Sequence, residues 1–89
     1  MSTEQLLQNQ REHLATQVEP LSNHCLKISF NTGDVKVFDV KPYLNKGIFG
    51  KLRDPALFNQ AYVAYDTVCW PGNLDIAPET LFIRGISAQ

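Results

Sequence analysis

Cysteine and histidine are scarce in this chain, which contains two of each among its 89 residues. A secreted protein this short usually carries a denser set of disulfides. Metal-ligand spacings such as Cys-x-x-Cys and His-x-x-x-His do not occur, and the adjacent His24 and Cys25 would point to opposite faces of a strand. We therefore expect no metal site and no disulfide, with Cys69 buried as a small apolar residue and His24 exposed in a turn.

The chain also lacks a long apolar run and an excess of charge of one sign. No apolar stretch approaches the ~18 residues that a membrane helix needs, and the start of the chain has neither the basic nor the apolar region of a secretory signal. We therefore expect a soluble, cytoplasmic protein. Eight basic side chains oppose nine acidic ones, a net charge of −1, which argues against a protein built mainly to bind nucleic acid.

Catalytic motifs are missing as well. The sequence has no phosphate-binding loop, no Gly-x-Gly-x-x-Gly and no Ser-His-Asp set. Four aspartates could form an acid/base pair, but each has a structural explanation. Asp54 precedes a proline and would cap a helix, and Asp66 falls in a turn. Asp39 and Asp75 precede prolines by three residues, which also suits capping. We expect no enzymatic activity, no catalytic residue and no cofactor.

The composition, with 44% apolar and 10% aromatic residues, is that of an ordinary globular protein, and the length suits one domain. Residues 1–14 contain no glycine, proline or aromatic residue. Leu6, Leu7 and Leu14 lie near one helical stripe, which predicts a short amphipathic N-terminal helix. A frayed arm is the alternative, because isolated helices of this length are marginal in water. Residues 15–89 are predicted to form a single α+β domain.

Alternation of apolar and polar residues predicts a hairpin at residues 26–40. Leu26, Ile28 and Phe30 share one face of its first strand, and a glycine-containing turn at residues 31–34 leads into the second. In the second strand two large apolar residues, at positions 37 and 38, are adjacent. Either that end of the strand is buried on both faces, or a bulge resets the register.

The remaining pattern predicts a second hairpin and several short helices. Strands are expected at residues 61–65 and 68–70, turning at positions 66 and 67. Helices opened by prolines are expected at residues 55–60 and 78–84, and residues 15–21 should be extended. Together these elements predict two antiparallel hairpins in one twisted sheet of about four strands, covered on one face by short helices. The predicted core consists of Leu26, Ile28, Phe30, Val37, Phe38, Leu44, Phe49, Leu52, Phe58, Val63, Val68, Trp70, Leu81 and Phe82.

Basic residues cluster in one stretch of the chain, residues 41–53. Lys41, Lys46, Lys51 and Arg53 lie there with Tyr43. Nucleic-acid grooves combine such charges with aromatic side chains on which bases stack. A solvated loop whose aromatic residues anchor it to the core explains the pattern more simply, because four charges on a net-acidic domain give a weak field. An acidic protein partner would be served equally well.

Four stretches follow one another in an order typical of one family: LKISFNTGDVKVFDV, KPYL, GIFGKLRDPALF and VAYDTVCWPGNLDIAPETLF. This succession, over residues 18–83, resembles the bacterial family called domain of unknown function 2442. The resemblance implies a small α+β domain with an antiparallel sheet. Some relatives precede a helix-turn-helix, and others stand alone beside another small protein in loci that resemble toxin–antitoxin pairs. The order of Gly72 and Asn73 departs from the family pattern after the tryptophan.

The function we expect is that of a non-catalytic protein-interaction module of a small bacterial operon, antitoxin-like in its role. The alternative is a nucleic-acid-binding accessory domain that uses the basic face of residues 41–53. The sequence does not identify the partner protein. We also expect a homo-oligomer, paired through sheet edges or through the N-terminal arms, because a domain of this size buries little surface per residue. A monomer whose arm folds back on its own sheet is the alternative.

Overall fold

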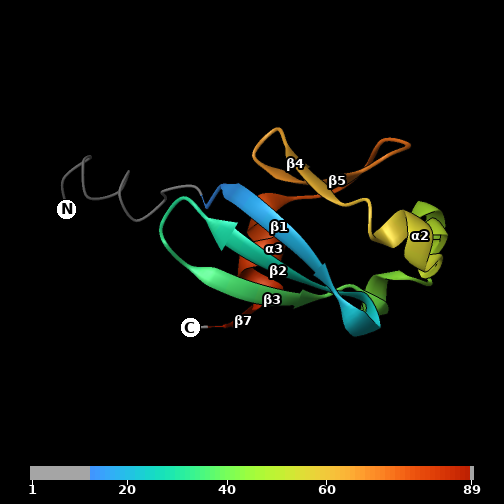
Figure 1. The fold of residues 1–89 in the computed structure, drawn as a ribbon, viewed down its shortest axis with the longest axis horizontal. Helices are drawn as coiled ribbons and strands as arrows, with labels where there is room; N and C mark the ends of the chain where they lie inside the picture. The colour runs from blue at the N-terminus through green and yellow to red at the C-terminus, as the bar shows by residue number, and fades with distance from the viewer. Residues whose placement is uncertain (1–12, 89) are drawn as a thin grey trace.

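A computed structural model describes residues 13–88 of the chain, which form strands, short helices and 3₁₀ helices (Figure 1). The N-terminal helix predicted within residues 1–14 falls almost entirely outside the described residues. The strands are β1 (Ala15–Leu21), β2 (Cys25–Phe30), β3 (Val35–Asp39), β4 (Tyr62–Ala64), β5 (Thr67–Trp70), β6 (Leu74–Ile76) and β7 (Ile86–Ser87). The helices are α2 (Pro55–Phe58), α3 (Pro78–Arg84) and the 3₁₀ helices η1 (Ser22–His24), η2 (Lys41–Tyr43) and η3 (Gly47–Arg53).

The strands form two antiparallel sheets, which corrects the expectation of one sheet. The first hairpin is part of a four-stranded sheet of order β1-β2-β3-β7, and the second is part of a three-stranded sheet of order β4-β5-β6. The α+β class is confirmed. The strands that the sequence pattern did not predict, β6 and β7, are short, with three and two residues. Such short segments carry too few residues for alternation to be recognised.

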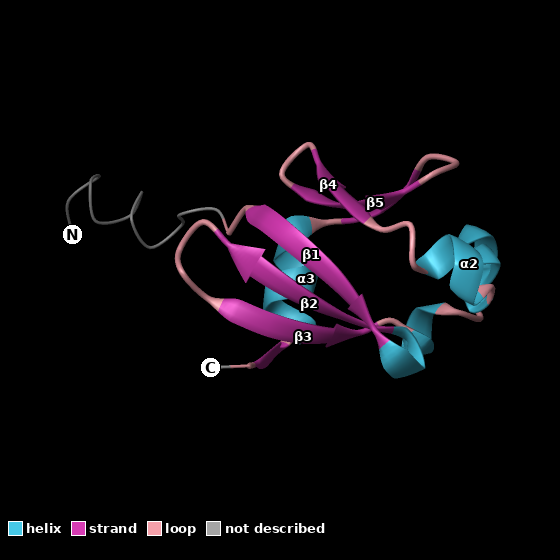
Figure 2. Cartoon of the chain, in the orientation of Figure 1, coloured by secondary structure: helices cyan, strands magenta, loops and turns pink. Residues whose placement is uncertain are grey.

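The four-stranded sheet has one covered face and one open face. Figures 1 and 2 show α3 behind this sheet and no other described element across the face toward the viewer. Leu26 is paired with Phe38, and both are buried on the covered face. Lys27 is paired with Val37 on the opposite face. Val37, predicted to be in the core, is therefore only half-buried and lies on the open face.

The adjacent apolar residues at positions 37 and 38 do not mark a bulge. The register between β2 and β3 is continuous, so Val37 and Phe38 point to opposite faces as in any strand. The irregularity lies instead in the edge strand β1, where the pairing with β2 shifts between Ala15 and Gln17. Bulges and prolines are typical of edge strands, and Pro20 lies in the same strand.

The second hairpin turns one residue earlier than predicted. Tyr65 and Asp66 form a two-residue loop with φ of 53° and 63°, and Ala64 pairs with Thr67 across it. Positive φ at both loop residues is the geometry that matches the right-handed twist of the flanking strands. Asparagine and glycine usually occupy such positions, so the sequence alone did not identify the turn.

The sheets and α3 enclose one core, with Trp70 at its centre. Trp70 is 0% exposed, and its Nε1 donates a hydrogen bond of 3.0 Å to the backbone oxygen of Phe58. The prediction that Trp70 is a core residue is confirmed. Further predicted core residues are buried: Leu26, Ile28, Phe30, Phe38, Leu52, Phe58, Val68 and Leu81. Others pack half-buried against them: Leu44, Phe49, Val63 and Phe82. The prediction omitted Ala15, Val40, Leu74 and Ile76, which are buried.

Asp54 and Asp66 have the local roles predicted for them, whereas the N-cap of η2 is Val40 and Asp39 only bonds the first residue of that helix. Asp54 caps α2, because its Oδ1 accepts a hydrogen bond of 3.0 Å from the backbone N–H of Ala56. Asp39 accepts one of 2.9 Å from the N–H of Lys41. The prediction for Asp75 is wrong: it lies in β6, and the N-cap of α3 is Ala77, without a side-chain hydrogen bond. Helix α2 also ends at Phe58, two residues before the predicted end.

Candidate functional site

The basic stretch forms a loop of 3₁₀ helices, η2 and η3, in which most charges already have partners. Lys41 forms an ion pair of 3.0 Å with Asp39 and donates a hydrogen bond of 2.8 Å to the backbone oxygen of Asn23. The guanidinium of Arg53 donates to the side-chain oxygen of Asn45. The Nζ of Lys46 lies 5.4 Å from the centre of the Tyr43 ring. The loop is thus cross-linked to itself and to β3.

The aromatic residues of this loop anchor it to the core. The ring of Tyr43 stacks against that of buried Phe38, with centroids 5.6 Å apart, and Phe49 meets Tyr43 edge-on at 6.3 Å. Tyr43 and Phe49 are both half-buried against the core. A surface for base stacking needs exposed ring faces, so this packing favours the simpler explanation of the basic stretch, a solvated loop with aromatic anchors.

The ion pair of Lys41 and Asp39 changes the pKa of both groups. Burial opposes ionisation of Asp39, but hydrogen bonds from the Lys41 backbone and side chain, together with its charge, outweigh burial and lower the pKa of Asp39 from the ordinary 3.8. The hydrogen bond to Asp39 raises the pKa of Lys41. Cys25, a free half-buried thiol, lies 3.9 Å from the Lys41 Nζ. Asp39 and Lys41 are both charged at neutral pH, so their ion pair fixes the start of η2.

His24 does not lie exposed in its turn, as the sequence predicted. It is half-buried because its ring packs against Phe58, with the ring centroids 4.9 Å apart. Its Nε2 lies 3.3 Å from the backbone oxygen of Arg53. His24 therefore joins η1 to the end of η3. Within residues 13–88, no three His, Cys, Asp or Glu side chains gather in a group that could hold a metal ion.

The face of the four-stranded sheet opposite α3 is left open by the described elements, and we call it the outer face. One row of residues crosses it from strand to strand: Ile86, Val37, Lys27 and Glu19, in the order β7, β3, β2, β1. Ile86 is 75% exposed. Glu19 and Lys27 are exposed cross-strand neighbours, yet no ion pair joins them among the interactions of the described residues. The row thus has an apolar end, on β7 and β3, and a charged end, on β2 and β1.

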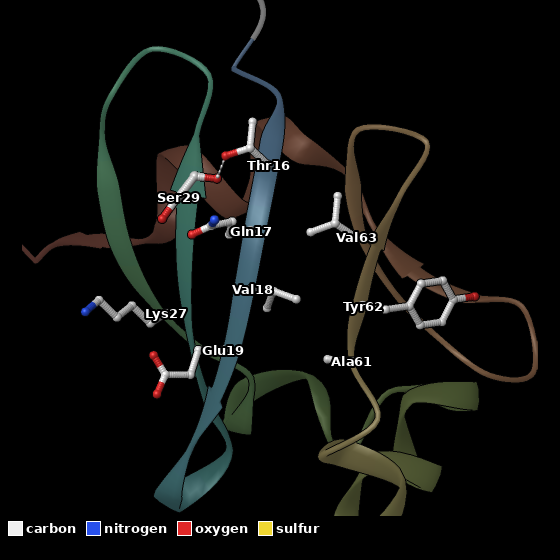
Figure 3. A pocket seen from close by; sticks show the side chains of 9 residues that line it. All are labelled: Thr16, Gln17, Val18, Glu19, Lys27, Ser29, Ala61, Tyr62 and Val63. Atoms are coloured by element: carbon white, nitrogen blue, oxygen red, sulfur yellow. Dashed lines mark hydrogen bonds between the residues drawn. The ribbon is translucent and has the colours of Figure 1, made fainter.

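A groove of about 470 Å³ continues this face beyond β1. Figure 3 shows β1 and β4 running side by side, with the side chains of Val18 and Val63 in the gap between them and those of Gln17 and Glu19 on the side of the sheet. Val18, Ala61 and Val63 belong to the half-buried apolar layer around the core. The groove is lined by Thr16, Gln17, Val18, Glu19, Lys27, Ser29, Ala61, Tyr62 and Val63.

The groove has the anatomy of a protein-binding surface rather than of a catalytic cleft. Its small aliphatic residues come from two strands, and polar side chains surround them, as in the centre and rim of an interface. Its two charged residues, Glu19 and Lys27, are exposed, and its lining contains no histidine or cysteine. Sequence patterns could not identify this groove, because β1 and β4 belong to different sheets and meet only in the tertiary structure.

A smaller hollow of about 200 Å³ lies on the three-stranded sheet, beside the exposed Tyr62 and Tyr65. Cys69 lies in it, and burial together with the charge of Asp75 raises the pKa of the Cys69 thiol, against a smaller lowering by a hydrogen bond with the Ala64 backbone. A raised pKa makes this thiol a poor nucleophile. As predicted, Cys69 is buried.

The described residues were examined for membrane spans, and the chain was compared with known proteins. Within residues 13–88, no helix combines the length and the apolar character needed to cross a membrane. Searches among curated proteins and among solved structures found no match. The model of the family described as protein of unknown function (DUF2442) matches residues 15–87, which include every strand and helix described above. The chain therefore belongs to this family, as the order of its sequence stretches indicated.

Proposed function

We propose that this domain is a non-catalytic protein-interaction module that binds a protein through the outer face and the adjoining groove. One observation carries the proposal: the exposed charged residues Glu19 and Lys27 have apolar surface on both sides. Val37 and Ile86 provide that surface on one side, and the groove floor provides it on the other. Exposed apolar surface beside charged side chains can dock a protein partner, because apolar burial provides affinity and complementary charges provide specificity.

The biological setting is proposed from the family resemblance. Stand-alone relatives encoded beside another small protein suggest an antitoxin-like role in a bacterial operon, in the cytoplasm. The alternative function, nucleic-acid binding through residues 41–53, has less support. Lys41 and Arg53 have partners within the chain, and Tyr43 and Phe49 are turned to the core. The described contacts of that loop therefore serve the fold.

Site-specific photo-crosslinking in the natural host tests the proposal. A photoreactive amino acid at Gln17, on the groove, should form adducts with protein, whereas the same amino acid at the exposed Lys51 should not. Adding Ala61→Glu, which places a charged side chain on the groove floor, should abolish the Gln17 adducts. The matched variant Gln60→Glu changes an exposed neighbour and should leave them intact.

The outcomes separate the two functions. Nucleic-acid adducts at position 51, without protein adducts at position 17, would support the alternative function. Protein adducts at both positions, equally sensitive to salt and unaffected by Ala61→Glu, would indicate non-specific contact and contradict a docking surface at the groove. Circular dichroism of each variant confirms that the fold is kept.

A further inference from the structure

The outer face is arranged symmetrically about the line between β1 and β2. Lys27 and Glu19 lie immediately on either side of that line. Val37 lies one strand further out on the β3 side, and the groove lies at the same step on the β1 side. Beyond these, Ile86 projects from β7, and Tyr62 stands at the far side of the groove. Lys27 and Glu19 thus mirror each other with opposite charge, Val37 mirrors the groove, and the exposed apolar residues Ile86 and Tyr62 mirror each other at the outer positions.

A two-fold axis along this line would place those counterparts against each other. Rotation by 180° about an axis parallel to the strands, between β1 and β2, sets Glu19 of one copy opposite Lys27 of the other, and does so twice. The same rotation sets Val37 of each copy over the groove of its partner, and Ile86 at the far side of that groove, beside Tyr62. Two sheets whose strand directions nearly coincide can pack face to face in this way, about 10 Å apart.

We infer that the partner of the outer face is a second copy of this chain, docked face to face about that axis. The inference rests on the proposed function, because it assigns an occupant to the same surface. Charge complementarity carries it: Glu19 and Lys27 are exposed and, among the interactions of the described residues, are joined to no other charge. Each is therefore available to the opposite charge of a second copy. Val37 meets the aliphatic groove floor, and Ile86 meets the partner's Tyr62.

A charge-swap experiment tests this arrangement with the full chain. Light scattering of the parent protein at micromolar concentration should give twice the 10.0 kDa of one chain. Glu19→Lys and Lys27→Glu should each weaken the dimer about 100-fold, because each single variant brings two like-charge pairs together across the axis. An equimolar mixture of the two variants should dimerise again, since lysines from one chain then face glutamates from the other.

The mixing step separates the interface from effects within one chain. Each single variant carries like charges on its own neighbouring strands, and mixing cannot relieve those. Recovery of the dimer on mixing therefore reports contact between copies. Lys51→Glu, a charge reversal on the exposed loop, should leave the dimer unchanged. Ile86→Ser should also weaken the dimer without lowering the melting temperature of the monomer, because Ile86 is 75% exposed in one chain.

The failure of this inference is distinguishable from the failure of the proposed function. A parent mass near 10.0 kDa that does not change with concentration, or a mixture that stays monomeric, overturns the second copy as occupant. If the single variants then also lose the protein adducts at position 17, the face binds a different protein and the proposed function stands. If a monomeric parent keeps those adducts in every variant, both the inference and the outer face as docking surface are wrong.

Discussion

A lysine on the covered face of a sheet is an unusual residue, and Lys36 is one. It shares that face with Ile28, its partner across the strands. Its Nζ donates a hydrogen bond of 2.8 Å to the backbone oxygen of Phe82 and lies 3.8 Å from the centre of the Phe82 ring. The cation thereby satisfies a carbonyl near the C-terminus of α3, where positive charge is favoured. Lys36 therefore connects β3 to α3 by one polar contact.

Replacing Lys36 by methionine removes the charge, keeps an aliphatic side chain of similar length, and so tests what the charge contributes to stability. Lys36→Met should lower the free energy of unfolding by about 1–2 kcal/mol, because a charged hydrogen bond and a cation–π contact are lost while the aliphatic packing remains. Urea unfolding followed by circular dichroism measures the change. Lys51→Met, on the exposed loop, is the matched control and should stay within about 0.5 kcal/mol of the parent.

Trp70 supplies the largest fully buried side chain of the core. Trp70→Ala should lower the free energy of unfolding by about 3–5 kcal/mol, because it removes that packing and the hydrogen bond to Phe58. Trp70→Phe should lose less, since it keeps a ring in the site. Thermal melting by circular dichroism measures both. A Trp70→Ala protein that melts like the parent, or iodide quenching of the parent's tryptophan fluorescence as complete as in the unfolded chain, would contradict the assignment.

The Cys69 thiol should show its raised pKa in two ways. Below the ordinary pKa of 9.0 the neutral thiol favours the folded state fully, and this contribution is lost as the pH rises and the thiol of the unfolded chain ionises first. The difference in the free energy of unfolding between the parent and Cys69→Ala should therefore become smaller above pH 9.0.

In the native parent, iodoacetamide should alkylate the half-buried Cys25 before Cys69. Equal alkylation rates would contradict a raised pKa at Cys69.

At the scale of elements, the hairpin of β4 and β5 contains a conformation that its residues do not favour. Tyr65 has φ of 53° and is 93% exposed. A bulky residue with positive φ is strained, and this side chain recovers little by burial. Two interactions hold the strained turn in place. The pairing of Ala64 with Thr67 needs a turn of this shape, and the N–H of Ala15 donates a hydrogen bond of 2.9 Å to the backbone oxygen of Asp66.

Relieving the strain should stabilise the domain. Tyr65→Asn should raise the free energy of unfolding by about 1 kcal/mol, because asparagine adopts positive φ more readily and no buried contact is lost. Tyr62→Asn is the contrasting control. It removes a residue that favours strands from β4, so it should give no gain in stability. Thermal melting compares the two, and destabilisation by Tyr65→Asn would show that the tyrosine makes a stabilising contact.

At the scale of the whole molecule, the outer face distinguishes between modes of association. The sequence led us to expect pairing through sheet edges or through the N-terminal arms. The structure makes a third mode available, because among the described elements only α3 covers the four-stranded sheet, and it does so on one face (Figure 2). Self-association by the outer face uses residues between positions 17 and 86, none of which belongs to the arm.

Deleting residues 1–12 should leave the dimer mass and the melting temperature unchanged. The reason is that the proposed contact consists of Glu19, Lys27, Val37, Ile86 and the groove. Light scattering of the truncated and full-length chains at matched concentrations makes the comparison. A truncated protein that becomes monomeric would show that the arm provides the contact.

Local patterns in the sequence predicted the elements that follow from neighbouring residues. The hairpin of β2 and β3 was recognisable because alternating side chains and a glycine turn act over a few positions. The start of α2 was recognisable because Asp54 and Pro55 form a cap and a first helical residue. Burial of Trp70 followed from its position at a strand end in so small a domain. These predictions depend on physics that acts within one element.

The division into two sheets, the covering of one face and the groove were decided only by tertiary structure. Val37 looked like a core residue because its neighbour Phe38 is one, and only the position of α3 shows which of the two is buried. Lys36 has its partner in Phe82, far along the chain, and no local pattern indicates that contact. Val18 and Val63 meet between edges of different sheets, a contact that no periodicity encodes. The sequence determined which segments pair locally, whereas the packing of the segments determined which surface is left for a partner.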